Sequence, residues 1–265
     1  MKMIWLKHDY LEAALKLKGK PPDSSNVRRT LHGDSMLISP DGKIVALYLR
    51  NVIPVRFQKR AYRVLRHVSD LPANRVPAVG TISLPRGRRK DGTWSPRWGV
   101  NEKVVRVLKR QGVRTSIFGY LPCYETRLTK RHPEMLFRNK ALIKLIDSLY
   151  KQHLPTIYER QLAIVENVRH CLLGNSPFSS LYVTKNWQTS CHCDGNLKGT
   201  MTAITTLGEF TDGALVLVRW GIAIPYQPGD VLFFDAEQLH GNLSFKGKRL
   251  SVTLYCARKI TDCAK

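Results

Sequence analysis

Residues 189–196 read T-S-C-H-C-D-G-N, and residues 228–241 read P-G-D-V-L-F-F-D-A-E-Q-L-H-G. In the first stretch, His192 and Asp194 are two residues apart, so in an extended segment their side chains project to the same side. In the second stretch, an apolar strand and a turn lead to His240, 46 residues after Asp194. Two histidines and one carboxylate form the facial triad that binds non-haem Fe(II) and leaves positions open for a co-substrate and dioxygen. We therefore predict an iron site made of these three side chains.

An arginine follows the last histidine by nine residues. Arg249 lies in K-R-L-S-V-T-L-Y at 248–255, a β-type run, with Ser251 on the same side of the strand. A lone arginine on a strand is commonly a surface or ion-pair residue. Next to an iron site, its guanidinium can bind a carboxylate through two hydrogen bonds. We therefore predict that Arg249 and the Ser251 hydroxyl bind the C5 carboxylate of 2-oxoglutarate.

The part of the chain around these motifs has the texture of a β-fold preceded by helices. Short β-type runs alternate with Gly, Pro and Asp turns across residues 178–260, which predicts a barrel or a sandwich. Residues 134–172 carry apolar side chains at three- and four-residue steps, as an amphipathic helix does. Pro155 is expected to divide this stretch into two helices that pack against the sheet.

The front of the chain carries most of the positive charge. The net charge of the 265 residues is +23, and residues 1–130 hold 27 basic and 9 acidic side chains, a net +18. An excess concentrated in one half indicates a polyanionic partner, and nucleic acid fits best. Within this half, residues 1–20 have helical spacing, residues 35–55 predict a hairpin around Asp41-Gly42, and residues 56–70 form a basic amphipathic segment.

Residues 84–99, L-P-R-G-R-R-K-D-G-T-W-S-P-R-W-G, are expected to form a basic loop. One interpretation is a solvated loop. The other is a nucleic-acid contact, in which basic side chains bind phosphates and Trp94 or Trp98 stacks on a base. The phosphate-binding candidates are Arg86, Arg88, Arg89 and Lys90.

Cysteine usage and apolar runs bear on the compartment. The six cysteines include no C-x-x-C pair and no regular disulfide spacing, and residues 1–5 lead into no secretory signal. We expect reduced thiols and a nuclear or cytoplasmic protein that is not secreted. No run of 18 apolar residues is present, and no basic amphipathic helix of the membrane-surface type stands out. We therefore expect no membrane partner, and nothing in the sequence points to an obligate protein partner.

Four stretches together resemble a known family. They are V-T-K-N-W-Q-T-S-C-H-C-D-G-N at 183–196, T-L-G-E-F-T-D-G-A-L-V-L at 206–217, and the stretches at 228–241 and 248–255 already quoted. This set resembles the 2-oxoglutarate/Fe(II) dioxygenases of the double-stranded β-helix fold, and most of all their TET and base-J-binding-protein branch. The context of Asn186, the triplet Arg-Leu-Ser and the basic front half support that branch.

The resemblance implies an α+β protein with a double-stranded β-helix (jelly-roll) core, packed helices and a basic N-terminal extension. It also implies Fe(II), 2-oxoglutarate and dioxygen as cofactors, and oxidation of the 5-methyl group of a pyrimidine in DNA, with 5-methylcytosine the first choice and thymine the second. The base would be flipped out of a duplex or taken from a single strand. One relative of this branch resembles the chain but uses ascorbate, so ascorbate stays open as a reductant or alternative co-substrate.

We expect one dioxygenase domain over residues 1–265. Its parts would be a basic N-terminal part at 1–130, supporting helices at 134–172 and a jelly-roll catalytic core at 178–260.

Several alternatives remain at the level of single residues. Asn186 could contact the substrate in the pocket or cap a turn at a strand end, and Asp235 could face the target base or cap its loop. The side chains of Cys191, His192, Cys193 and His240 could form a zinc site, although neighbours in an extended C-H-C segment point to opposite faces.

Two other functions share the same iron core. A protein hydroxylase of this fold could act on a basic or nucleic-acid-associated protein. A binding protein with an inactive site is the third class, and the intact triad argues against it.

Overall fold

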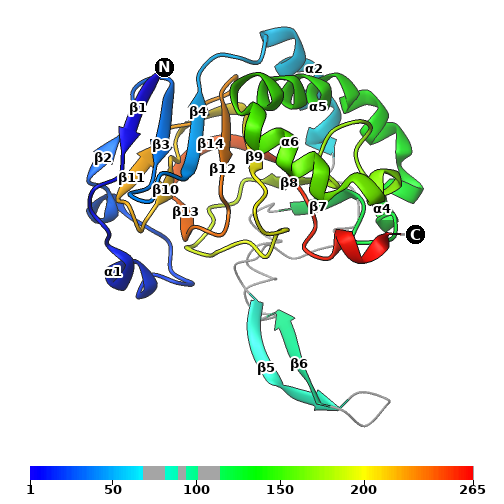
Figure 1. Ribbon diagram of the computed structural model, residues 1–265, viewed down its shortest axis with the longest axis horizontal. Coiled ribbons are helices and arrows are strands. Elements are labelled where there is room, and N and C mark those ends of the chain that lie inside the picture. The colour runs from blue at the N-terminus through cyan, green and yellow to red at the C-terminus, as the bar shows by residue number, and fades with distance from the viewer. Residues whose placement is uncertain (68–80, 89–93, 101–113, 265) are drawn as a thin grey trace.

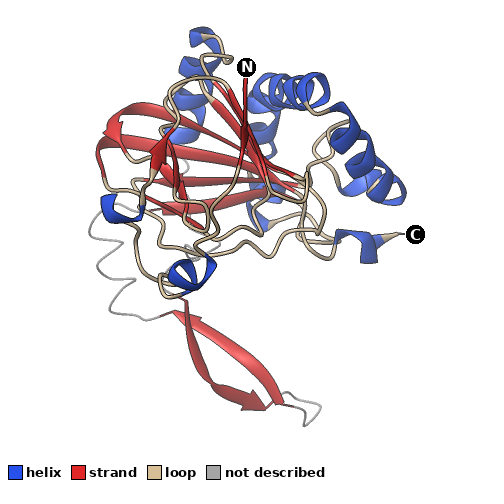
Figure 2. Cartoon of the chain, turned by 60° about the vertical axis from the view of Figure 1, so that its left-hand side comes forward, coloured by secondary structure: helices blue, strands red, loops and turns tan. Residues whose placement is uncertain are grey.

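The computed structural model describes residues 1–67, 81–88, 94–100 and 114–264, and for 81–88, 94–100 and 114–115 it describes the backbone alone. Two β-sheets face each other, and helices cover the outer face of the larger one (Figures 1 and 2). The expected α+β jelly-roll fold with packed helices is confirmed. No described helix has the length and apolar character needed to cross a membrane.

The larger sheet has eight strands, and its centre is a long antiparallel pair. Strands β9 and β14 pair from Asp212 opposite Phe245 to Ala203 opposite Leu254. The strand order is β1 (Lys2–Trp5), β3 (Ser35–Ile38), β4 (Ile44–Leu49), β12 (Val231–Phe234), β9 (Thr202–Asp212), β14 (Phe245–Tyr255), β8 (Ser180–Lys185) and β7 (Arg114–Gly119). The first fifty residues therefore supply three strands of this sheet.

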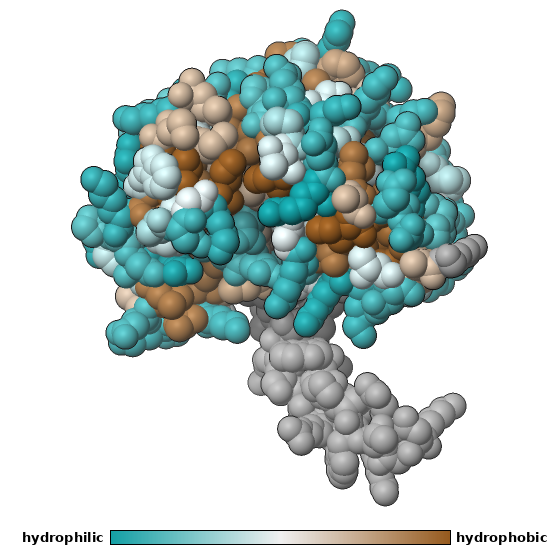
Figure 3. All heavy atoms as spheres, in the orientation of Figure 1, coloured by the Kyte–Doolittle hydropathy of each residue, from teal (hydrophilic) through white to brown (hydrophobic). Residues whose placement is uncertain are grey.

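The smaller sheet has four strands and carries part of the predicted site. Its order is β13 (His240–Asn242), β10 (Leu215–Leu217), β11 (Ile222–Ile224) and β2 (Arg29–Thr30). A buried apolar cluster between the sheets includes Tyr48, Leu217, Ile224 and Phe234. In the space-filling view of Figure 3, hydrophilic side chains cover most of the visible face, with apolar side chains between them.

Alternation along the central strand separates two environments. On β14, Leu250, Val252 and Leu254 belong to the cluster shared with the helices, whereas Arg249 and Ser251 lie on the opposite face, toward the smaller sheet. A strand buried on both faces can thus hold a packing surface on one side and functional groups on the other.

The helical layer follows the predicted pattern. Helix α5 (Pro133–His153) and helix α6 (Pro155–Ile164) meet at Leu154, and each begins with proline at its first position, where the missing N–H costs nothing. The expected break at Pro155 is confirmed. The other helices are α1 (Leu11–Leu15), α2 (Val55–Leu65) and α4 (Arg127–Arg131), with 3-10 turns η1 (Ser24–Asn26), η3 (Glu166–Cys171) and η4 (Ile260–Cys263).

Three expectations for the front half meet different outcomes. The hairpin around Asp41-Gly42 is confirmed as β3 and β4. The segment 56–70 is confirmed as helical over α2, whose basic and apolar side chains lie on different faces. The helical spacing in residues 1–20 is confirmed only for the short α1. The first residues form β1 instead, which is the edge strand of the larger sheet.

The expected loop at 84–99 is wrong for most of its length. Strand β5 (Thr81–Arg88) pairs with β6 (Trp94–Val100), from Thr81 opposite Val100 to Arg88 opposite Trp94. The sequence between them contains Asp91-Gly92, a dipeptide typical of hairpin turns, and the high density of Arg, Gly and Pro obscured it.

The expectation of reduced thiols throughout is also wrong. Cys123 and Cys263 form a disulfide, with their Cα atoms 5.1 Å apart and a sequence separation of 140. The turn η4 packs against η3, which brings the C-terminal segment back to the chain that follows β7. Sequence spacing cannot reveal such a tertiary approach. The other four cysteines, Cys171, Cys191, Cys193 and Cys256, are not disulfide-bonded.

Candidate metal and co-substrate site

Strand β13 and the segment before β9 bring the three predicted iron ligands together. His192 and His240 face each other in an isolated bridge, in which each backbone N–H donates to the other's carbonyl, at 2.9 and 3.0 Å. The Asp194 N–H donates to the Ala236 carbonyl at 2.8 Å, which fixes the carboxylate beside the loop that leads to His240. One ligand atom from each of the three side chains lies within 4.8 Å of the others. Across the described ranges, no other group of His, Cys, Asp and Glu meets this criterion.

Backbone carbonyls orient both imidazoles for metal binding. Nδ1 of His192 lies 2.8 Å from the Ser190 carbonyl, and Nδ1 of His240 lies 2.8 Å from the Gln238 carbonyl. Each Nδ1 therefore carries the proton and donates it, which leaves the Nε2 lone pair for a metal. Two imidazole nitrogens and one carboxylate fit Fe(II). The hydrogen bonds from Nδ1 to the backbone carbonyls hold the two rings in place.

The charges around the site differ between the two histidines. Burial and, to a smaller extent, the neighbouring His192 lower the pKa of His240 to about 4, so His240 is neutral and ready to bind a cation. Burial also lowers the pKa of His192, but the hydrogen bond to Asp194 and the charge of that carboxylate outweigh it and raise the pKa overall. Nε2 of His192 lies 3.2 Å from Oδ1 of Asp194. A metal ion would replace the proton shared by this pair.

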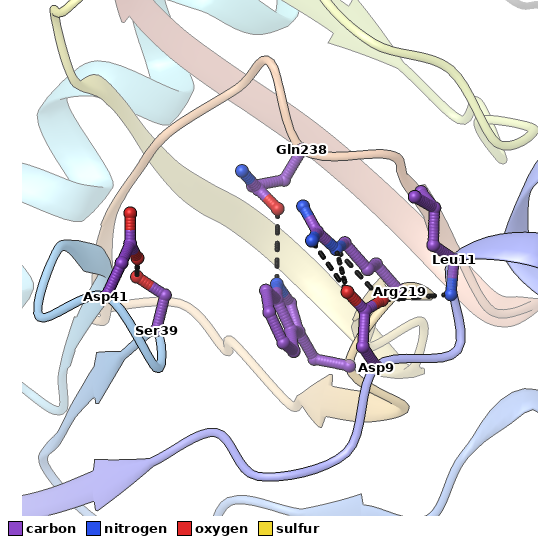
Figure 4. Close-up of polar contacts among 7 residues, drawn as sticks. Asp9, Leu11, Ser39, Asp41, Arg219 and Gln238 are labelled. Atoms are coloured by element: carbon purple, nitrogen blue, oxygen red, sulfur yellow. Dashed lines mark hydrogen bonds and ion pairs between the residues drawn. The ribbon is translucent and has the colours of Figure 1, made fainter.

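Side chains outside the triad brace the loop before His240. Gln238 accepts a hydrogen bond from Nε1 of Trp220 at 3.1 Å, and its own amide donates to Asp235 at 3.0 Å. Figure 4 shows Gln238 above this indole, with Arg219 paired to Asp9 beside it. The guanidinium of Arg219 binds both oxygens of Asp9, with Nη2 to Oδ2 at 2.7 Å, which ties the N-terminal segment to the turn after β10.

Arg249 is the largest fully buried side chain of the described protein, with 1 % of its surface exposed. No carboxylate of the described residues forms an ion pair with it. Its Nε donates to the Ser251 hydroxyl at 3.1 Å, Nη1 donates to the Gly213 carbonyl at 2.9 Å, and Nη2 donates to the Tyr226 hydroxyl. A buried cation without a negative partner is costly, so this arrangement favours the binding of an anion.

Aromatic rings enclose the guanidinium. The Arg249 carbon Cζ lies 5.0 Å from the ring centroids of Tyr226 and Phe245, and 5.5 Å from that of Phe210. Gly213 completes the enclosure, because a Cβ atom there would lie 2.6 Å from Nη1 of Arg249 and 2.8 Å from Cβ of Phe245. Its φ of +78° also suits glycine. None of these four residues was predicted from the sequence, although the turn Asp212-Gly213, within the stretch at 206–217, was a usable signal.

A hydrogen-bonded link joins the two halves of the site. Nδ2 of Asn242 donates to the Tyr226 hydroxyl at 2.9 Å, and that hydroxyl also accepts from Arg249. Asn242 lies two residues after His240 on β13, so both side chains project to the same side of the smaller sheet. The structure thus brings the triad, Arg249 and Ser251 to one region between the sheets, as the motif spacing predicted.

The two tentative substrate residues have structural contacts. Oδ1 of Asn186 accepts from the Arg249 backbone N–H at 3.0 Å, and Asn186 has a φ of +53°, so it caps the strand end. It also lines a cavity of about 330 Å³ with Trp187, whose Nε1 is buried there without a partner among the described residues. Asp235 accepts from the Glu237 N–H at 3.0 Å and from Gln238, which is the capping alternative.

The zinc alternative does not fit the geometry. Cys191 is buried and Cys193 is exposed, and neither belongs to the group of converging ligand atoms. Burial raises the pKa of the Cys191 thiol to about 11, whereas a zinc ligand must be a thiolate. Among the phosphate-binding candidates, Arg86 and Arg88 lie on β5, where only the backbone is described, and Arg89 and Lys90 lie outside the described residues.

Known proteins resemble this chain in both sequence and fold. Residues 118–258 match the family Tet_JBP, described as the oxygenase domain of the 2OGFeDO superfamily. The bifunctional helicase and thymine dioxygenase JBP2 of Trypanosoma brucei brucei is 30% identical over 234 residues, which are 84% of this chain and 20% of that protein. The thymine dioxygenase JBP1 of the same organism is 30% identical over 238 residues, 88% of this chain and 26% of that protein. The chain therefore spans about a fifth to a quarter of the length of these relatives.

A solved structure confirms the fold. NgTET1 in complex with 5mC DNA matches with a TM-score of 0.59 at 15% identity, over 98% of this chain and 83% of that one. At this identity the likeness bears on the arrangement of the sheets and helices alone.

Proposed function

Because this chain belongs to the Tet_JBP oxygenase family of the 2OGFeDO superfamily, we propose that it is an Fe(II)- and 2-oxoglutarate-dependent dioxygenase that oxidises the 5-methyl group of a pyrimidine in DNA. The observation that carries the proposal is the pairing of a His-Asp-His triad with a buried arginine that has no carboxylate partner in the described structure. The first fits the metal, and the second fits the far carboxylate of 2-oxoglutarate.

The overall reaction balances as a coupled oxidation. One 2-oxoglutarate and one dioxygen react with a methyl group to give succinate, carbon dioxide and a hydroxymethyl group. Fe(II), when bound, supplies the activation of dioxygen. His192, Asp194 and His240 would hold it through two Nε2 atoms and one carboxylate oxygen.

The remaining residues would bind and orient the co-substrate. Arg249 would bind the C5 carboxylate through its guanidinium, and the Ser251 hydroxyl would add a hydrogen bond. The rings of Tyr226, Phe210 and Phe245 exclude water from this end, which strengthens the electrostatic attraction. A buried guanidinium supports the dicarboxylate 2-oxoglutarate over ascorbate, which remains a reductant or alternative co-substrate to be tested.

Two methylated bases are proposed as substrates. The resemblance to the TET branch makes 5-methylcytosine the first choice, and the names of the curated relatives support thymine. DNA as partner is supported by those relatives and by the net charge of +23. Action on DNA also supports the proposed nuclear or cytoplasmic location.

The test is a substrate panel that isolates the methyl group. One duplex carries 5-methylcytosine with uracil in place of thymine, a second carries thymine with unmodified cytosine, and a third carries only uracil and cytosine. RNA and a basic peptide complete the panel. We expect an oxidised nucleoside, detected by mass spectrometry, and succinate release above the level without substrate with the first or second duplex, and neither effect with the third. Turnover with the peptide alone would instead establish the protein hydroxylase.

A further inference from the structure

A basic groove lies on the opposite side of the larger sheet from the metal site. Helices α2 and α5 line it, and its volume is about 690 Å³. We define the helical groove by its lining residues Arg56, Arg60, Arg63, Val64, His67, Met135 and Arg138. The helices pack on the sheet face that carries Leu250 and Val252, whereas Arg249 and Ser251 face the other way. The larger sheet therefore separates the helical groove from the proposed catalytic cavity, the region between the sheets that holds the triad, Arg249 and Ser251.

Basic side chains form one stripe that runs along α2 and just past its end. The stripe consists of Arg56, Arg60 and Arg63 on α2 and of His67 two residues after it, at steps of four, three and four residues, a spacing that places side chains on one face of a helix. From Arg56 to Arg63 the stripe is about 10 Å long, at 1.5 Å per residue. One strand of duplex DNA presents a phosphate about every 3.4 Å along its axis, so this length faces about three phosphates.

The groove has no negative charge of its own to offset these cations. Helix α2 contains no acidic residue, and within the described ranges no ion pair joins Arg56, Arg60, Arg63 or Arg138 to a carboxylate. Glu134, at the start of α5, pairs with His132 instead, at 3.3 Å. Clustered like charges repel one another, and a polyanion relieves that repulsion.

A membrane surface is a poorer fit for this stripe. A helix that lies on a bilayer inserts its apolar face among the lipids. In α2 that face is already used, because Ala61 and Leu65 are buried in the core and Phe57 and Tyr62 pack against it. What remains outside is the charged stripe, which suits a polymer of phosphates.

We propose that the helical groove is a second DNA-binding site, which holds the sugar–phosphate backbone of a DNA stretch other than the one that enters the catalytic cavity. The choice of DNA rests on the proposed function. The contacts are to phosphates, so they do not depend on base sequence or methylation. Its role is retention: a long DNA stays bound through the groove while successive bases reach the cavity.

The test compares two variants with the same change in charge. The groove variant is R56Q/R60Q/R63Q on α2, and the control is K140Q/K144Q/K151Q on the outward face of α5; all six side chains are exposed. The probe is an unmethylated fluorescent duplex long enough to reach both sites, titrated from 50 to 200 mM salt. Because binding of this duplex needs no oxidation, the result is independent of whether the proposed reaction occurs.

We expect the groove variant to lower the slope of log affinity against log salt by up to about 2.7, at about 0.9 per phosphate contact. Over the fourfold salt range, the salt-dependent loss of affinity then shrinks by up to about 40-fold. The control should change the slope by less than half as much. Equal changes in both variants would mean general charge attraction and would overturn the proposal, as would an unchanged slope in the groove variant.

Two further arms identify the partner and the role. Vesicles with anionic headgroups should bind wild type and groove variant alike, and a loss of vesicle binding with unaltered DNA binding would reassign the groove to lipid. If the proposed reaction is present, oxidation of a long duplex should fall in the groove variant while oxidation of a short oligonucleotide stays the same. Equal falls on both substrates would contradict a separate site.

Discussion

Arginine is used in two opposite ways on the two faces of the larger sheet. Between the sheets, Arg249 is buried among three aromatic rings, and each of its three guanidinium nitrogens donates to a defined acceptor. On the outer face, Arg56, Arg60 and Arg63 are exposed and repeat along one helix. The first arrangement suits one carboxylate in one orientation, and the second suits a polymer of phosphates in many registers.

Solvent explains why the difference matters. A buried charge interacts strongly because little water screens it, but each change to its surroundings is costly. Exposed charges are screened over about 8–10 Å at physiological salt, so each one contributes little and only their sum is large. The two faces should therefore respond very differently to single substitutions.

The largest effect is expected at the metal ligands. Asp194→Ala and His240→Ala should each lower turnover by more than about 100-fold. Loss of a residue that only hydrogen-bonds to a metal ligand already lowers metal affinity or activity about 10- to 100-fold. Anaerobic iron loading followed by metal analysis should show weakened binding. DNA affinity should stay the same, because the helical groove lies on the other face. A variant that keeps near-normal turnover under Fe(II) would show that its residue is not a ligand.

The next effect concerns the co-substrate. Arg249→Ala should raise the KM for 2-oxoglutarate about 10- to 100-fold, because a charge-assisted hydrogen bond is worth about 1.5–3 kcal/mol. Arg249→Lys keeps the charge but loses the planar pair of N–H donors, so it should recover only part of the affinity for 2-oxoglutarate. Iron binding should be spared in both. Turnover that ignores 2-oxoglutarate and follows ascorbate would assign the site to ascorbate.

A smaller effect is expected where only space is lost. Gly213→Ala places a Cβ atom 2.6 Å from Nη1 of Arg249, so the guanidinium must shift and the KM for 2-oxoglutarate should rise about tenfold. Gly199→Ala is the matched control. Gly199 has a φ of +73°, close to the +78° of Gly213, but nothing lies within 4 Å of its Cβ position. Equal KM changes in the two variants would point to backbone strain rather than to crowding.

The smallest effect is expected when the groove variant R56Q/R60Q/R63Q is tested without DNA. Its uncoupled conversion of 2-oxoglutarate to succinate should stay within about twofold of wild type, because exposed charges across the sheet are screened from the cavity. Succinate measured at two salt concentrations checks this. A large loss would mean that the two faces are coupled.

Local patterns were enough to predict the core of the site. The spacing of His192 and Asp194 and the β-type run around Arg249 are short-range features, and the structure places them on one side of their segments. The helix break at Pro155 and the hairpin at Asp41-Gly42 are local in the same sense. Each depends on backbone preferences that a few neighbouring residues determine.

Features made by distant segments could not be predicted in this way. The aromatic rings around Arg249 come from β9, from the chain after β11 and from β14, and their meeting depends on the strand register. The disulfide between Cys123 and Cys263 depends on how the C-terminal turn packs. The helical groove needs both α2 and α5, so the sequence showed the excess of charge in the front half but could not show this groove.

The most direct test of the catalytic assignment follows the oxygen atoms. The protein is incubated under ¹⁸O₂ with Fe(II), 2-oxoglutarate and the methylated duplex, and succinate and nucleosides are analysed by mass spectrometry. We expect succinate with one ¹⁸O atom, formed in step with a hydroxymethylated pyrimidine, and neither product with Asp194→Ala. An oxidised pyrimidine that appears without labelled succinate would contradict the assignment of 2-oxoglutarate to Arg249 and of the chemistry to the space between the sheets.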